Sequence, residues 1–211
     1  RPDFAPFDEQ VLAMGELMKA GKIRHWGISN ENAFGVARFV EAAGRLGVPL
    51  PVSIQNDFSM LYRKFEQDGT AEACSPLHTG QDGGIALLAY GPLAGGTLSD
   101  KYSMSGEAVA RCRHVLYPTF QRRYHSEASL EAASRFASVA KRHGLTPAQL
   151  ALAWTAGREY VGAVIIGATS QEQLEENISA FDVELSKECL EEVDKVNLEF
   201  ERPFHRPNSA S

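Results

Sequence analysis

The hydrophobic and polar positions of the chain follow two patterns, one with helical spacing and one of short continuous apolar runs. Over residues 7–20, apolar side chains recur at mostly helical intervals and Gly21 follows, which predicts an amphipathic helix that ends there. Four apolar runs bounded by glycine, proline or asparagine predict strands at residues 23–29, 52–55, 85–90 and 162–166. The segments between and around them predict further helices at residues 33–46, 64–74, 127–143, 147–158, 170–180 and 187–200.

This alternation of strands and helices predicts an α/β fold with parallel strands and with ligand sites at their carboxyl ends. The sheet belongs either to an open doubly wound domain or to part of a barrel. A complete (β/α)8 barrel takes about 250 residues, and four strands make half of one. We therefore expect residues 1–211 to form a single domain that is the C-terminal half of a barrel, with the N-terminal half missing.

Two helix starts carry strong local signals. Thr146, Pro147 and Gln149 have the pattern of a capping box with proline at the first helical position. Residues 170–173 repeat the capping-box pattern. Between the third strand and the helix at 127, residues 95–125 predict a long irregular loop, a kind of segment that is usually functional or mobile.

Composition narrows the class of protein. With 44% hydrophobic and 23% charged residues, the chain has the make-up of a globular protein. A net charge of -6 argues against non-specific binding to nucleic acid, and the apolar runs are shorter than the roughly 20 residues that span a membrane. Three separated cysteines and six histidines without ligand spacing predict neither a disulfide framework nor a metal site.

The first residues and the cysteines of the chain bear on its cellular compartment. The first residue is arginine, and no signal-peptide or transit-peptide pattern follows it, so we expect the natural N-terminus to lie upstream. The cysteine usage fits a reducing compartment. We expect the cytoplasm, with a plastid as the alternative if a transit peptide preceded this chain.

Polar residues and glycines stand where each predicted strand finishes. The four segments are Gly-Ile-Ser-Asn at 27–30, Ile-Gln-Asn at 54–56, Ala-Tyr-Gly-Pro-Leu at 89–93 and Ile-Ile-Gly-Ala-Thr at 165–169. Such residues at strand ends are what a barrel needs to build a ligand site at one rim.

In these segments the chain resembles the aldo-keto reductases, in the branch that includes Tas-like proteins and potassium-channel beta subunits. Further matching residues are Gly-Lys-Ile-Arg at 21–24, Gly-Thr-Leu at 96–98, Lys101 with Tyr102, Gln173, and Glu176 with Asn177. The resemblance runs nearly end to end. It implies a TIM barrel, NADP as cofactor across the carboxyl-terminal rim, and a small carbonyl substrate, an aldehyde or ketone, in the full-length form.

The resemblance also implies a role for each matching residue. Ser29, Asn30 and Gln55 would hold the nicotinamide carboxamide through hydroxyl and amide groups, and Tyr90 would stack under the nicotinamide ring. The segment over the pyrophosphate would comprise Gly91, Pro92, Leu93, Ala94 and Gly95, with the cations Lys101 and Arg113. The adenosine and its 2'-phosphate would be held by Gly167, Thr169, Gln173, Glu176 and Asn177.

This chain departs from the family pattern in two ways, and each limits what the resemblance implies. Some members carry Lys and Arg where this chain has Gly167 and Gln173, so the preference for NADP over NAD is open. The family's catalytic Asp, Tyr, Lys and His lie on the first four barrel strands, which this chain lacks. We assign no catalytic residue and expect the chain alone to be inactive in carbonyl reduction.

Each assignment has a structural alternative. Ser29 and Asn30 could cap the following helix, Gln55 could satisfy loop backbone, and Tyr90 could be a core aromatic. Gln173 has a capping role in any case, and Lys101 and Arg113 could be surface charges.

The alternatives for the whole chain are a non-catalytic dinucleotide-binding or regulatory module and the open doubly wound domain. Two unpaired sheet edges would favour either a homo-oligomer or association with the missing N-terminal half.

Overall fold

The structure, a computed structural model, describes residues 5–99, 113–119 and 121–201. The chain folds into two compact units that interleave along the sequence. The first, called the sheet unit, comprises Arg1–Asp57, Arg63–Tyr90 and Arg158–Val164. The second, called the helical unit, comprises Phe58–Tyr62, Gly91–Gly157 and Ile165–Ser211. The single-domain organisation stays a prediction.

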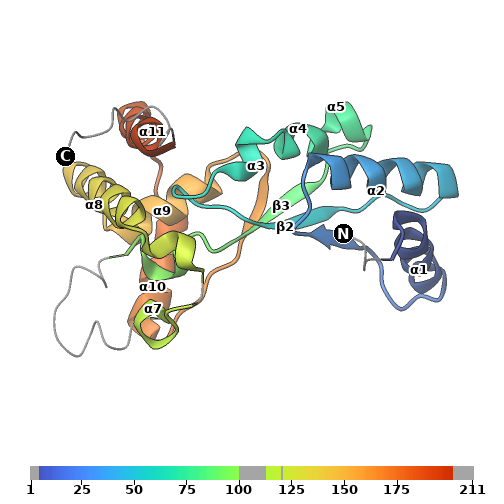
Figure 1. Cartoon of the computed structure of the whole chain (residues 1–211), viewed down its shortest axis with the longest axis horizontal. Coiled ribbons are helices and arrows are strands. Elements are labelled where there is room, and N and C mark those ends of the chain that lie inside the picture. Colours follow the sequence, from blue (N-terminus) through green and yellow to red (C-terminus); the bar gives the residue numbers. More distant parts are fainter. Residues whose placement is uncertain (1–4, 100–112, 120, 202–211) are drawn as a thin grey trace, which may run out of the picture. The chain divides into compact units, whose positions relative to one another are not determined.

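The sheet unit is built on four parallel strands, which confirms the α/β class. These are β1 (Gly27–Ser29), β2 (Ser53–Asp57), β3 (Ala86–Tyr90) and β4 (Val161–Val164), and they lie in the order β1-β2-β3-β4 (Figure 1). Each strand thus pairs with its neighbour in sequence. Ser29 pairs with Gln55, and Gln55 pairs with Leu88, so the carboxyl ends of the first three strands lie at one edge of the sheet.

The first strand is shorter than the sequence predicts. It begins at Gly27 rather than residue 23, because its partner β2 begins only at Ser53, two residues after Pro51, which has no amide hydrogen to donate. The residue before β1, Trp26, accepts a backbone hydrogen bond from the amide of Val52 at 2.9 Å, and its side-chain Nε1 donates to the carbonyl oxygen of Pro49 at 2.7 Å. In the other direction, β2 continues two residues beyond the predicted end, to Asp57.

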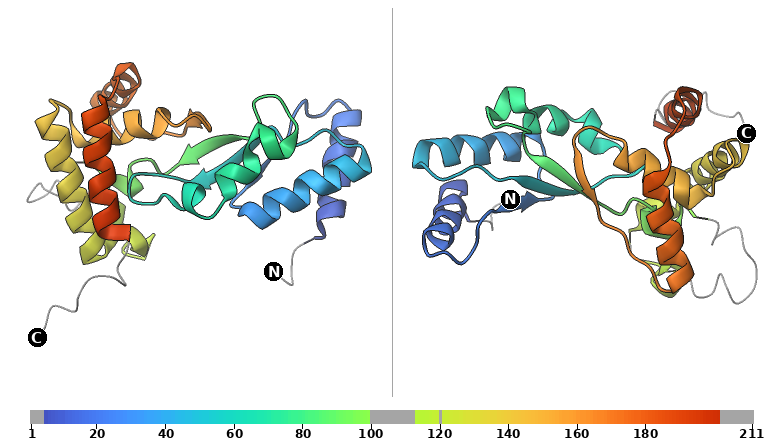
Figure 2. Two further views of the ribbon diagram at one scale, coloured as in Figure 1. Left: turned by 90° about the horizontal axis from the view of Figure 1, so that it is seen from above. Right: turned by 180° about the vertical axis from the view of Figure 1, so that it is seen from behind.

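One face of the sheet is buried and the other carries the polar residues. Ile28, Ile54 and Leu87 are buried, whereas Ser29 and Gln55 alternate with them and are exposed. Helices α2 (Ala33–Leu46) and α4 (Thr70–Cys74) lie side by side along the sheet, and α1 (Phe7–Lys19) packs on α2 (Figures 1 and 2). The bounds of α2 are those that the sequence predicts.

The helix predicted over residues 64–74 is wrong as a single element. It is divided into α3 (Lys64–Gln67) and α4, and α5 (Pro76–Thr79) follows. The break falls at Gly69, whose φ of 81° lies in the left-handed region. Asp68 stabilises the break, because its Oδ1 accepts a hydrogen bond from the amide of Thr70 at 3.1 Å.

The helical unit holds a second core around an aromatic pair. Trp154 and Phe58 are fully buried, and their rings stack with centroids 5.4 Å apart. Trp154 belongs to α9 (Pro147–Ala156), in which seven residues are buried, six of them in succession from Leu150 to Thr155, as in a helix enclosed by its surroundings. The unit's other elements are η1 (Ala94–Gly96), α7 (Arg113–Leu116), η3 (Arg122–His125), α8 (Glu127–Arg142), α10 (Gln171–Ser179), η4 (Ala180–Asp182) and α11 (Lys187–Glu201).

The capping box predicted at the start of α9 is confirmed. Thr146 Oγ1 accepts from the amide of Gln149 at 3.1 Å, and the amide of Thr146 donates to Gln149 Oε1 at 3.0 Å. Two backbone donors that the first helical turn leaves without an intrahelical partner are satisfied in this way. Of the long loop predicted over residues 95–125, the described parts contain η1, α7 and η3, and residues 100–112 and 120 lie outside them.

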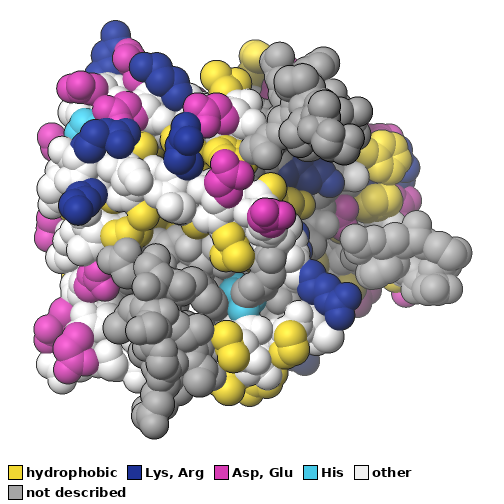
Figure 3. All heavy atoms as spheres, turned by 60° about the vertical axis from the view of Figure 1, so that its left-hand side comes forward, with side chains coloured by type: hydrophobic (Ala, Val, Ile, Leu, Met, Phe, Trp, Pro, Cys, Tyr) yellow, Lys and Arg dark blue, Asp and Glu magenta, His cyan; other side chains and the backbone are white. Residues whose placement is uncertain are grey.

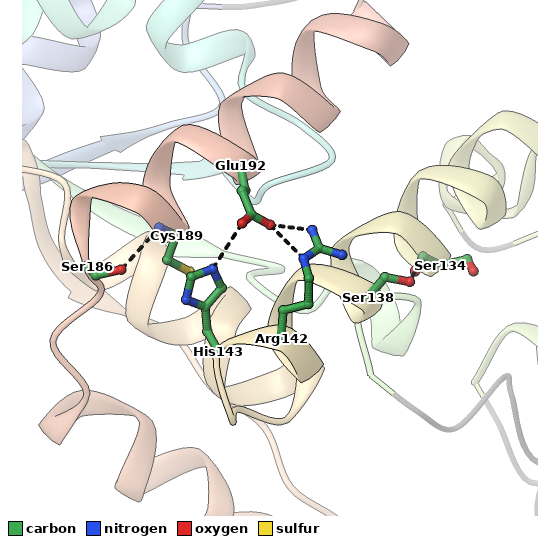
Figure 4. A network of polar contacts seen from close by, with 7 residues as sticks. All are labelled: Ser134, Ser138, Arg142, His143, Ser186, Cys189 and Glu192. Atoms are coloured by element: carbon green, nitrogen blue, oxygen red, sulfur yellow. Dashed lines mark hydrogen bonds and ion pairs between the residues drawn. The ribbon is translucent and has the colours of Figure 1, made fainter.

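Helices α8 and α11 are joined by a polar network around Glu192 (Figure 4). Arg142 donates through Nε to Glu192 Oε2 at 3.0 Å and through a second nitrogen to the same oxygen. His143 Nε2 lies 3.4 Å from the other carboxylate oxygen. Hydrogen bonding from Arg142 is the main cause that lowers the pKa of Glu192 below its ordinary value of 4.5.

We expect this network to make the helical unit sensitive to acid. Because the pKa of Glu192 is lower in the folded than in the unfolded chain, its contribution to stability is present above the ordinary carboxyl pKa and is lost as the pH falls through the lowered one. Glu192→Gln should therefore reduce the free energy of unfolding at neutral pH. The gap to the wild type should close below pH 4.5. Urea titrations monitored by circular dichroism at several pH values measure this gap.

The pair Arg135 and Glu199 provides a matched control, since it joins the same two helices at 2.8 Å but both side chains are 52% exposed. An exposed pair contributes little, so Glu199→Gln should leave stability nearly unchanged across the same pH range. A gap for Glu192→Gln that stays constant with pH would contradict the assignment.

Charged side chains of both signs are interspersed on the face shown in Figure 3. Exposed ion pairs of the described residues include Arg38 with Glu41 and Arg45 with Asp8. Among the helices of the described residues, none has the length and apolar character needed to cross a membrane.

Candidate functional site

Four of the predicted site residues lie in the sheet unit, near the carboxyl ends of β1, β2 and β3. Ser29 and Tyr90 are the last residues of β1 and β3, and Gln55 lies two residues before the end of β2. Tyr90 donates its hydroxyl hydrogen to Asn30 Oδ1 at 2.9 Å, and Asn30 Nδ2 donates to Ser29 Oγ at 3.1 Å. Ser29 Oγ in turn donates to the carbonyl oxygen of Gln55 at 3.1 Å. The structure thus brings Ser29, Asn30, Gln55 and Tyr90 together in one linked group, called here the strand-end cluster.

The backbone of Asn30 turns the chain out of β1 at this cluster. Its φ of 55° is left-handed, a conformation that asparagine adopts more readily than most residues. Its amide donates to the carbonyl oxygen of Gln55 at 3.0 Å, so the turn is fixed to the neighbouring strand. The side chains of Ser29, Asn30 and Gln55 are exposed, and that of Tyr90 is half-buried.

The structure bears on two of the structural alternatives, the capping role of Ser29 and Asn30 and the core role of Tyr90. Ser29 and Asn30 do not cap α2, because the N-cap is Asn32, whose Oδ1 accepts from the amide of Gly35 at 3.0 Å. The capping alternative is therefore wrong. Tyr90 is only partly enclosed and directs its hydroxyl group to Asn30, unlike an aromatic side chain fully buried in a core.

A fifth residue, Asn56, supports the cluster and was not assigned a role from the sequence. Its Nδ2 donates to the carbonyl oxygen of Glu31 at 2.8 Å and so holds the segment that follows Asn30. The signal available in the sequence was an amide residue directly after Gln55 at a strand end.

In the helical unit, residues 91–96 form a tight turn, called here the glycine loop. Four of its residues have positive φ, which are Gly91 (66°), Ala94 (50°), Gly95 (67°) and Gly96 (102°). Within the loop, the amide of Ala94 donates to Gly91 O and that of Gly96 donates to Leu93 O, both at 2.8 Å. Pro92 is buried, as is Ala94, while Leu93 and the glycines are partly exposed.

The two cations predicted beside this loop are not placed by the structure. Lys101 lies outside the described residues, and Arg113 is the first residue of α7. Their phosphate roles stay predictions.

The adenosine-side residues lie on the loop before α10 and on α10 itself. Gly167 and Thr169 are exposed. The side chain of Asn177 is buried and donates to Gly167 O at 3.4 Å. Glu176 Oε1 accepts from Thr146 Oγ1 at 2.7 Å, which attaches α10 to the start of α9.

The capping box predicted at residues 170–173 is only half formed. Ser170 Oγ accepts from the amide of Gln173 at 3.3 Å, as predicted. The side chain of Gln173 reaches one residue further back, however, and its Oε1 accepts from both the amide and the hydroxyl of Thr169 at 3.1 Å. Gln173 thus bonds to the residue before the N-cap, whereas Gln149 bonds to its N-cap Thr146, although the backbone of both N-caps is extended.

The start of α10 favours negative charge. Glu172 lies in the first turn, and its pKa is lowered chiefly by a hydrogen bond with the Ser170 side chain and then by one with its own backbone. The free amides and the dipole at a helix N-terminus act in the same direction on any anion held there.

The chain is similar to known proteins over most of its length. A model of the aldo/keto reductase family matches residues 2–198. Protein tas of Escherichia coli K12 is 40% identical over 191 residues, which are 90% of this chain and 53% of tas. An aldo-keto reductase of Babesia bovis is 36% identical over 174 residues, 82% of this chain and 60% of that protein.

A further relative is the probable voltage-gated potassium channel subunit beta of Arabidopsis thaliana, 35% identical over 187 residues. These cover 87% of this chain and 55% of the plant protein. The chain thus spans about half the length of the curated relatives it matches, and its four parallel strands represent part of the barrel fold that the family implies. Since the family model covers nearly the whole sequence, the chain belongs to the aldo/keto reductase family.

Proposed function

We propose that the chain supplies the NADP(H)-contacting part of an oxidoreductase that reduces an aldehyde or ketone in its full-length form. The observation that carries the proposal is the strand-end cluster, in which Ser29, Asn30 and Tyr90 are joined by hydrogen bonds where three parallel strands finish. Membership of the family supports a nicotinamide dinucleotide as the cofactor.

The cluster fits the chemistry of a nicotinamide. Its carboxamide has one acceptor and two donors, and the hydroxyl of Ser29 with the amides of Asn30 and Gln55 can satisfy both kinds. The ring of Tyr90 offers an aromatic face on which a planar ring can stack. When bound, the cofactor supplies a hydride, and a ring covered by Tyr90 on one side would present only the other side to a substrate.

The helical unit fits the remaining parts of such a cofactor. Positive φ at Gly91 and Gly95 lets the backbone of the glycine loop approach a pyrophosphate closely. Thr169 and the start of α10 are suited to the adenosine 2'-phosphate, which carries negative charge. Gln173 and Asn177 would act there by shaping the loop, since their side chains already bond to Thr169 and Gly167.

We assign no catalytic residue, so the chain alone is expected to bind cofactor without reducing a carbonyl. The test is titration of the purified chain with NADPH, followed by cofactor fluorescence. Tyr90→Ala should weaken binding about tenfold, because stacking on an aromatic side chain contributes about 1–3 kcal/mol. Asn30→Gly should weaken it as well. Glycine keeps the left-handed backbone at this position and removes only the amide.

Tyr117→Ala is the matched control, since it removes a tyrosine that is 63% exposed and outside both groups of residues. Equal affinities of Tyr90→Ala, Tyr117→Ala and the wild type would reject the cluster as the nicotinamide site. Failure of a folded, monodisperse wild-type chain to bind NADPH would reject the proposal for the chain alone.

The similarity to potassium channel beta subunits favours a second candidate, a regulatory module that binds a dinucleotide without turnover. The gene sequence upstream of the codon for Arg1 separates the two candidates. Strand-end Asp, Tyr, Lys and His residues encoded there would favour the enzyme, and their replacement by other residues would favour the module. The small carbonyl substrate, the preference for NADP over NAD, the cytoplasmic location and a homo-oligomer all stay predictions.

A further inference from the structure

The glycine loop is held in a strained conformation by a residue from a distant part of the helical unit. Ala94 has a φ of 50°, and a left-handed backbone costs a residue with a side chain about 1–2 kcal/mol. Such a conformation persists only where surrounding contacts enforce it. Besides the hydrogen bonds within the loop, one such contact comes from α7, which lies 20 residues further along the chain.

The residue that makes these contacts is His114. Its Nε2 lies 3.2 Å from the carbonyl oxygen of Ala94, and because a carbonyl oxygen can only accept, Nε2 is the donor. The ring also lies directly against Gly95, where an added Cβ would be 2.5 Å from Nε2. His114 is 3% exposed, so the donated hydrogen bond is shielded from water.

A second contact holds the end of the loop independently of His114. Thr97 Oγ1 donates to the carbonyl oxygen of Tyr124 at 3.2 Å, and both residues are buried. The polypeptide after the loop therefore stays attached to the unit without the histidine. Within residues 91–96, the left-handed Ala94 and Gly95 are the residues that the hydrogen bond and the ring of His114 contact.

We propose that His114 is a positioning residue that fixes the glycine loop and thereby sets the affinity for the two bridging phosphates of the dinucleotide. The proposal rests on the proposed function, in which this loop covers the pyrophosphate. Backbone amides that bind phosphate must converge before the ligand arrives, since ordering them on binding costs affinity. His114 orders the loop in two ways. Its hydrogen bond holds the carbonyl group of Ala94, and its ring restricts the backbone positions that Gly95 can take.

The test compares two substitutions that differ in hydrogen bonding. His114→Leu keeps an apolar side chain in the buried site but cannot donate to Ala94, whereas His114→Gln retains an NH2 donor. We expect His114→Leu to weaken NADPH binding about tenfold and His114→Gln to restore most of the affinity. His143→Ala removes a histidine of the same unit at the end of α8 and should leave binding unchanged.

A second readout separates positioning from general damage to the unit. 2'-AMP carries the adenosine phosphate but no pyrophosphate, so its affinity should be the same for His114→Leu and the wild type. Equal losses for 2'-AMP and NADPH, or no loss for NADPH, would overturn the proposal.

Hydrogen exchange tests the loop without any ligand. The amides of Gly96, Thr97 and Leu98 donate to carbonyls of Leu93 and Ala94. They should exchange faster in His114→Leu and recover in His114→Gln. Unchanged exchange would overturn the role of His114 even if the wild type bound no NADPH, whereas loss of wild-type binding with the expected exchange would reject the proposed function alone.

Discussion

Replacement of Trp154 by alanine is expected to lower the free energy of unfolding of the helical unit by about 3–5 kcal/mol. The side chain is fully buried and stacks on Phe58 with ring centroids 5.4 Å apart. It lies in α9, a helix in which most residues are buried, so the packed neighbouring side chains cannot easily fill the space left behind. Both the lost burial and the remaining cavity therefore contribute to the cost.

Chemical denaturation followed by circular dichroism measures this effect, and the two tryptophans of the chain add information on each unit. Trp26 lies in the sheet unit and Trp154 in the helical unit, so the fluorescence of Trp154→Ala reports the sheet unit alone. Leu198→Ala, at a position that is 56% exposed, should cost less than about 0.5 kcal/mol. A Trp154→Ala variant as stable as Leu198→Ala would show that this core does not hold the helical unit together.

Local signals in the sequence predicted the helices of this chain more closely than its strands. The bounds of α2 and the capping box at Thr146 follow from residues within a few positions of each other. The start of β1 depends instead on where β2 begins, because a strand needs a pairing partner. The sequence did not predict the break at Gly69, because a helix often continues through a glycine that lies inside a helical pattern.

The candidate site could be predicted in its residues but not in its contacts. The resemblance to a family pointed to Ser29, Asn30 and Tyr90, and the structure adds the hydrogen bonds between them, across residues up to 60 positions apart. The side chain of Gln173 bonds to Thr169 rather than completing the capping box, a difference that the shared residue pattern of the two helix starts does not reveal. His114 had no signal in the sequence, since its partner Ala94 is 20 residues away.

The second large effect is expected at Gly84, two residues before β3. Its φ of +67° is left-handed, and an added Cβ would lie 2.4 Å from the carbonyl oxygen of Cys74 and 3.1 Å from Pro76. That carbonyl also accepts the hydrogen bond from the amide of Ile85 at 2.8 Å, so it cannot move away without releasing the start of β3. Gly84→Ala should therefore cost about 1–2 kcal/mol for the backbone and about 1–3 kcal/mol more for the collision.

The neighbouring Gly83 separates these two costs. It has a similar φ of +73°, but an added Cβ there would meet nothing within 4 Å. Gly83→Ala should thus carry the backbone cost alone, and the difference in free energy of unfolding between the two variants, measured by urea titration followed by circular dichroism, should equal the cost of the collision. Because β3 ends in Tyr90, displacement of its start should also weaken NADPH binding in Gly84→Ala and leave it unchanged in Gly83→Ala. Equal stabilities of the two variants would mean that the segment from Cys74 to Pro76 yields to the new methyl group, and that β3 does not depend on the close approach at Gly84.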